Sequence, residues 1–96
     1  MKLLFIFCPG STIDHVRNLI DVHEVHGFTE IPEAGGEGET GRRMGSRAWP
    51  GVSSVVITAA PEGKAVELTE ALTAFAETCS PDEGIRVYQV PVERVI

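Results

Sequence analysis

Short apolar runs alternate along this chain with longer segments in which apolar residues recur every three or four positions. Residues 3–8 (LLFIFC) are all apolar, which predicts a central strand buried on both faces. Residues 52–60 (VSSVVITAA) are rich in β-branched side chains and predict a second buried strand. Apolar and polar residues alternate in 28–33 (FTEIPE) and in 85–92 (IRVYQVPV), and each of these segments predicts a further strand.

Two intervening segments have the period of a helix. In the first, Ser11 is the predicted N-cap and Asp14 lies three residues later, near the positive end of the helix. We expect this helix to end near Val25 or His26, because Gly27 is the favoured left-handed residue just past a helix end. Its apolar stripe consists of Ile13, Val16, Leu19, Ile20 and His23.

The second helical segment is opened by Pro61-Glu62-Gly63 and is broken by residues 80–84 (SPDEG). Its buried stripe is predicted at Ala65, Leu68, Leu72, Phe75, Ala76 and Cys79. The resulting order is βαβ–βαβ. This order predicts an α+β, ferredoxin-like fold for residues 1–96 as a single domain, with an antiparallel four-stranded sheet and both helices on one face.

Charge and cysteine content narrow the function classes. The 96 residues carry 14 acidic and 8 basic side chains, a net charge of −6. A net-acidic chain without a basic stripe argues against nucleic-acid binding. Cys8 and Cys79 do not form a Cys-x-x-Cys motif and are expected to be free thiols in a reducing compartment. The starting run LLFIF is too short for a signal-peptide core or a membrane span, so we expect a cytoplasmic protein without direct membrane insertion.

A glycine-rich segment, GGEGETGRRMGSRAWPG, occupies residues 35–51 of a loop expected at 34–51. Residues 36–41 match the G-x-G-x-x-G dinucleotide fingerprint, but a functional fingerprint turns from a strand directly into a helix. Here Gly45, Pro50 and Gly51 oppose a helix. Two interpretations stay open. The loop is merely flexible, with its arginines solvated beside glutamates, or it binds an anion and a partner.

Two short patterns carry a family resemblance. Val25-His26-Gly27-Phe28-Thr29 resembles the V-x-G-x-T that joins the first helix to the second strand in nitrogen-regulatory PII proteins, and residues 88–96 (YQVPVERVI) resemble the end of their last strand and the start of their tail. The resemblance implies a homotrimer whose inter-subunit clefts bind an adenine nucleotide. It also implies a long T-loop, set by the ligand, that docks on a target protein such as a transporter or an enzyme. No catalytic residues are implied.

The chain departs from the PII pattern in regions that hold phosphate donors in that family. The turn at residues 77–84 is acidic instead of basic, the loop is shorter, and only Arg86 stands near the position of the family's last-turn lysine. By analogy with the family, the predicted ligand-binding residues are loop glycines and nearby arginines, with Trp49 as the partner contact. They are Gly36, Gly38, Gly41, Arg42, Arg43, Arg47 and Arg86.

Other residue groups give competing hypotheses. His23 and His26 form a His-x-x-His at a helix end, which is compatible with a divalent metal as in CutA, another trimeric ferredoxin-like family. Cys8, Ser11 and His15 lack a visible orienting group and oxyanion site, so we expect no enzyme. A trimer without any ligand is a third possibility.

Overall fold

The computed structural model describes residues 1–38, 41–43, 53–79 and 84–96. Within them the chain forms six strands, two α-helices and one 3-10 turn. In order they are β1 (Lys2–Pro9), η1 (Gly10–Thr12), α1 (Ile13–Val22), β2 (Thr29–Ala34), β3 (Gly36–Gly38), β4 (Gly41–Arg43), β5 (Ser53–Ala60), α2 (Glu62–Ala76) and β6 (Arg86–Pro91).

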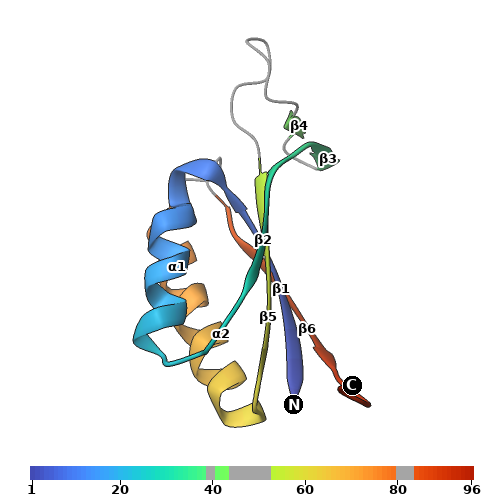
Figure 1. The fold of residues 1–96 in the computed structure, drawn as a ribbon. Coiled ribbons are helices and arrows are strands. Elements are labelled where there is room, and N and C mark those ends of the chain that lie inside the picture. Colours follow the sequence, from blue (N-terminus) through green and yellow to red (C-terminus); the bar gives the residue numbers. More distant parts are fainter. Residues whose placement is uncertain (39–40, 44–52, 80–83) are drawn as a thin grey trace.

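Four strands form one antiparallel sheet in the order β2-β5-β1-β6. Both helices lie on the same side of that sheet, so the molecule has two layers (Figure 1). The predicted ferredoxin-like α+β fold is therefore confirmed. None of the described helices is long and apolar enough to cross a membrane.

The hydrophobic core lies between the helices and one face of the sheet. Strand β1 contributes Leu4, Ile6 and Cys8, all at most 1% exposed, because alternate residues of a strand point to the same side. Strand β5 adds Val56 and Ala60 at the corresponding register. The helices complete the core with Val16, Ile20, Ala65, Leu68 and Leu72. All five belong to the predicted helical stripes.

The expectation that the first strand is buried on both faces is wrong. Leu3 and Phe5 are partly exposed, and Phe7 is 38% exposed. The cause is the layer arrangement: both helices cover the same face of the sheet, and no described segment covers the other (Figure 1). We call that uncovered side the open face.

The first helix begins later than predicted. Ser11 lies inside the turn η1, and the residue that precedes α1 is Thr12. Neither the turn nor the helix has a side-chain capping bond at its start. Instead the Thr12 hydroxyl, in a residue 4% exposed, donates to the backbone carbonyl of Pro9 at 2.9 Å. This bond closes the turn between β1 and α1 and satisfies a buried polar group.

The first helix also ends earlier than predicted. The left-handed residue after the helix is Glu24, with φ 56°, while Gly27 takes φ 85° farther on. The Glu24 amide donates to Asp21 O at 3.0 Å and the Val25 amide donates to Ile20 O at 3.1 Å. These two bonds define a Schellman motif. Buried Val25 and Ile20 supply the apolar contact that accompanies such a motif.

We predict that Glu24→Gly stabilises the fold. A side chain in the left-handed region costs on the order of 1 kcal/mol that glycine avoids. Allowing for the larger unfolded-state entropy of glycine, we expect a gain of about 0.5–1 kcal/mol, or about 2–8 °C in melting temperature. Glu24→Ala is the control, since it also removes the 3.5 Å contact with Lys64 but keeps a Cβ. A thermal melt in which glycine is no better than alanine would contradict the left-handed assignment.

Candidate ligand-binding site

Several residues predicted to bind a ligand lie at one end of the sheet. Strands β1 and β2 end there, β5 and β6 begin there, and the small hairpin β3–β4 extends beyond it (Figure 1). The antiparallel register explains this, because Pro9 pairs with Ser53 and Phe7 pairs with Arg86. We call this region the loop end of the sheet.

An irregularity in β2 leads into the hairpin. Ile31 pairs with Val55 and Ala34 pairs with Ser53, so β2 has one more residue than β5 between these pairs. The extra residue accompanies a left-handed backbone at Glu33, with φ 55°. Such a bulge bends the strand and increases its twist. The bulge therefore sets the direction in which the chain runs from β2 to β3.

The glycine-rich segment begins as a hairpin rather than as an irregular loop. Gly36 pairs with Arg43, Glu37 with Arg42, and Gly38 with Gly41 in antiparallel register. This backbone excludes the dinucleotide fingerprint for residues 36–41, because that motif requires a turn from a strand into a helix. Three glycines and two arginines that were predicted to bind a ligand thus lie on neighbouring strands. Arg47 and Trp49 fall outside the described residues.

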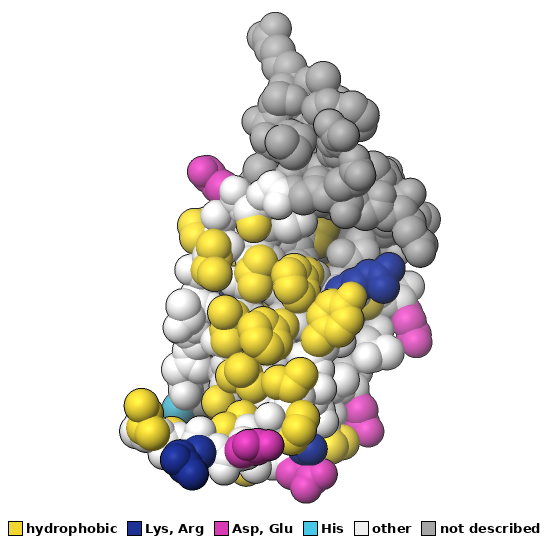
Figure 2. All heavy atoms as spheres, turned by 90° about the vertical axis from the view of Figure 1, so that its right-hand side faces the viewer, with side chains coloured by type: hydrophobic (Ala, Val, Ile, Leu, Met, Phe, Trp, Pro, Cys, Tyr) yellow, Lys and Arg dark blue, Asp and Glu magenta, His cyan; other side chains and the backbone are white. Residues whose placement is uncertain are grey.

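Arg86 stands at the loop end on the open face. It is exposed, and Val87 beside it packs against the core, so Arg86 and Tyr88 point away from the helices. The Tyr88 ring meets Phe7 edge to face, with ring centroids 5.7 Å apart. A guanidinium therefore borders the apolar surface that Figure 2 shows in yellow.

A second polar arrangement joins α1 to β2. Arg17 donates from Nε to Glu30 Oε1 and from Nη2 to Glu30 Oε2, each at 2.8 Å. Its third nitrogen, Nη1, donates to Asp14 Oδ1 at 2.8 Å. These acidic partners raise the pKa of Arg17, with the hydrogen bond to Glu30 as the largest cause. The Arg17 side chain is 41% exposed and that of Glu30 is 18% exposed.

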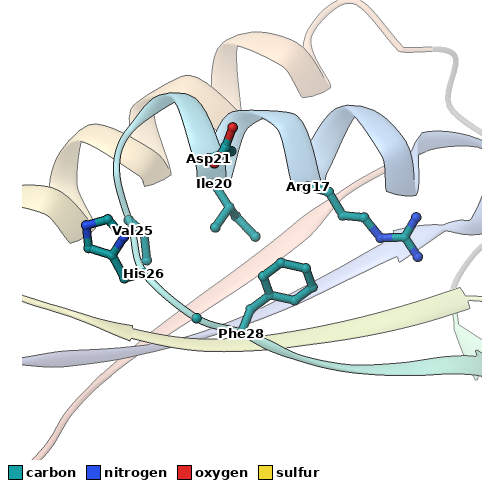
Figure 3. A pocket seen from close by; sticks show the side chains of 7 residues that line it. Arg17, Ile20, Asp21, Val25, His26 and Phe28 are labelled. Carbon is teal, nitrogen blue, oxygen red and sulfur yellow. The ribbon is translucent and has the colours of Figure 1, made fainter.

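A shallow depression of about 380 Å³ opens between α1 and the start of β2. Figure 3 shows the Phe28 ring turned toward Ile20, whereas the guanidinium of Arg17 points away from them. Sequence reasoning missed this depression. The alternation in residues 28–33 (FTEIPE) could have indicated it, because alternation places Phe28 and Glu30 on the same side of the strand. The residues that line it are Arg17, Ile20, Asp21, Val25, His26, Gly27 and Phe28.

The two histidines proposed as metal ligands have different surroundings. His23 Nδ1 lies 3.8 Å from Glu67 Oε2, and His26 is exposed and lines the depression. Across residues 1–38, 41–43, 53–79 and 84–96, no three His, Cys, Asp or Glu side chains are grouped so as to hold a metal ion. The metal hypothesis therefore gains no support.

Two of the residues considered for nucleophilic chemistry, Cys8 and His15, make packing contacts. Cys8 is 1% exposed, and burial is the largest cause of its raised thiol pKa. His15 stacks on Phe75 with ring centroids 3.8 Å apart and an angle of 6° between the planes. A buried, protonated thiol is a poor nucleophile, so the structure does not favour Cys8 for covalent chemistry.

We predict that thiol reagents distinguish the two cysteines. Cys79 is partly exposed and Cys8 is buried, and the raised pKa keeps Cys8 protonated. At pH 8, Cys79 should react at least about tenfold faster than Cys8 in the native protein. In denaturant the two rates should converge. The Cys79→Ser variant isolates Cys8, and rapid labelling of that variant under native conditions would contradict its burial.

A comparison with solved structures shows that this chain is similar to PII-like proteins. A structure of CPII, a nitrogen regulatory PII-like protein from Thiomonas intermedia K12, bound to ADP, AMP and bicarbonate, aligns with a TM-score of 0.74 and 26% identity, covering 97% of this chain and 88% of that one. A structure of CPII bound to ADP and bicarbonate aligns with a TM-score of 0.73 and 27% identity, and it covers the same share of each chain.

A PII-like signalling protein from Thermus thermophilus aligns with a TM-score of 0.69 and 20% identity, covering 93% of this chain and 83% of that one. At this identity the likeness is one of fold. No protein-family model and no curated protein matches the chain. The chain is thus similar to PII-like proteins over nearly its whole length.

Proposed function

We propose that this chain, which is similar to PII-like proteins over nearly its whole length, is a non-enzymatic signalling protein of the same kind. It acts as a homotrimer that binds a small ligand between subunits and presents its loop to a target protein, such as a transporter or an enzyme. The ligand is an adenine nucleotide or a small anion, since CPII was crystallised with ADP, AMP and bicarbonate.

The observation that carries the proposal is the open face. Cross-strand rows run from Ile57 through Phe5 to Tyr88 and from Ala59 through Leu3 to Val90. A third row joins Ile31, Val55 and Phe7. Ile31 is 49% and Tyr88 is 52% exposed, and the side chains form one continuous apolar surface (Figure 2). A contiguous patch of this kind is typical of an interface. Because each subunit presents the same face, association of identical copies covers all of them.

The ligand is proposed to bind at the loop end, where the open face meets the hairpin. Gly36, Gly38 and Gly41 lack side chains and permit close approach of a phosphate to the backbone. The cations come from Arg42, Arg43, Arg47 and Arg86, which offset the negative charge of a nucleotide or an anion. Arg86 supports this placement, because its register puts it beside the open face at the end from which the hairpin extends.

Signalling follows from differential binding. A ligand that contacts one conformation of the segment 34–51 more favourably than others raises the population of that conformation. The target protein then binds the favoured conformation, with Trp49 as the proposed contact because a large aromatic side chain is a frequent anchor in protein interfaces. No covalent step is needed.

We predict that Val90→Asp abolishes assembly. Val90 is 37% exposed on the open face, and a carboxylate buried there in every subunit would lack a partner. Light scattering after size exclusion should give a trimer for the parent protein and a subunit for the variant, with unchanged far-UV circular dichroism. Val66→Asp is the matched control, because Val66 is 45% exposed on α2, in the helix layer. A trimeric Val90→Asp variant would refute the proposed interface.

We predict that Arg86→Ala weakens ligand binding. Loss of one charge-assisted contact to an anion costs on the order of 1.5 kcal/mol, or about tenfold in affinity. Isothermal titration with ADP, with and without bicarbonate, measures the change. Arg94→Ala removes the same charge in the tail beyond β6, at the other end of that strand from Arg86, and should leave affinity unchanged. Equal effects of the two substitutions would argue against a site at the loop end.

A further inference from the structure

Glu30 occupies an unusual position for a carboxylate. It pairs with Val56, which in turn pairs with Ile6, and both of these are completely buried on the helix side of the sheet. An apolar residue at position 30 would continue that row into the core. The charged side chain is only 18% exposed, so it loses much of its hydration and depends on Arg17 for compensation.

The contact between Arg17 and Glu30 fixes the relative orientation of the two side chains as well as their distance. Two nitrogens of the planar guanidinium face the two oxygens of Glu30, each at 2.8 Å, and a two-point contact between planar groups restricts their relative orientation. The remaining nitrogen bonds Asp14, three residues earlier on α1. Arg17 is thereby held from both sides. The pair ties the edge strand β2 to the first half of α1.

This tie lies just before the point where β2 changes register. Ile31 follows Glu30 and makes the last regular pair, after which the left-handed Glu33 accompanies a shift of the strand by one residue. The hairpin begins at Gly36, at the end of this short irregular stretch. An edge strand is paired on one side only, so its end is less restrained than that of a central strand. A directional anchor immediately before the bulge therefore restrains the base of the hairpin.

We propose that Arg17 and Glu30 are a positioning pair that sets the orientation of the β3–β4 hairpin for ligand binding. The proposal rests on the proposed function for its ligand, but not for its effect on the hairpin. Stability alone does not account for a partly buried ion pair, because replacing such a pair with apolar residues is often neutral or stabilising. The contribution of the Arg17–Glu30 pair is to set the direction in which the chain leaves β2 and enters the glycine-rich segment.

The test compares two double variants with the parent protein. Arg17→Met with Glu30→Leu keeps side-chain volume nearly constant but removes the directional contact. Arg17→Glu with Glu30→Arg restores an ion pair of opposite polarity. Amide hydrogen exchange of Gly36–Gly38 and Gly41–Arg43 reports on the hairpin, and calorimetric titration with ADP reports on the site. Melting temperature is recorded for each protein.

We expect the apolar double variant to melt within a few degrees of the parent, to exchange its hairpin amides at least about fivefold faster, and to bind ADP at least about fivefold more weakly. The reversed pair should recover part of both losses. The control is Lys64→Met with Glu67→Leu, which removes a 3.9 Å ion pair near the start of α2, at the other end of the sheet. It should leave the hairpin unaffected.

Three results would be decisive. Hairpin exchange within about twofold of the parent in the apolar double variant would overturn the proposal and leave the pair a structural contact. Equal acceleration in the Lys64–Glu67 control would do the same, since the effect would then follow general destabilisation. Faster exchange confined to the Arg17–Glu30 variant supports the pair even when the parent binds no ADP, in which case the proposed ligand fails and the positioning role stands.

Discussion

The one-sided covering of the sheet governs the rest of this structure. Both helices pack on the face formed by residues such as Leu4, Ile6 and Val56, and none of the described segments forms a third layer on the other side. The opposite face nonetheless carries Phe5, Ile57 and other large apolar side chains. Water contact with such a surface is unfavourable in proportion to its apolar area. The chain is therefore folded but retains a large apolar surface that another protein surface can cover.

The same constraint brings the candidate site and the open face together. Arg86 enters the sheet at the loop end on that face, and the hairpin extends from the same end (Figure 1). A subunit packed against the open face would lie near both. In the proposed trimer the ligand site is therefore shared between subunits, and ligand binding and assembly stabilise each other.

The periodicity of the sequence was sufficient to predict the four strands of the main sheet, the two helices and their order. It did not predict β3 and β4, because residues 36–43 are rich in glycine and charge and lack an apolar alternation. The burial of β1 on both faces was predicted wrongly, because an apolar run looks the same whether its second face is covered by helices or left open, as here (Figure 1). Helix ends also depend on tertiary contacts. Ser11 and Thr12 are both suitable caps by type, and Gly27 is locally a better left-handed residue than Glu24. The burial of Val25 and Ile20 in one core instead ends the helix earlier than the glycine would.

The site was only partly accessible from sequence. Gly36, Gly38, Gly41 and Arg86 were predicted from the sequence and lie at or beyond the loop end of the sheet, where their ligand role stays a prediction. The pairing of Arg17 with Glu30 was not predicted, because it depends on the register between α1 and β2, which no local pattern specifies. Sedimentation equilibrium of the unmodified protein in dilute solution most directly tests whether the open face is an interface between identical copies. We predict a mass of three times the 10.4 kDa subunit. A mass equal to one subunit across the concentration range would contradict the account.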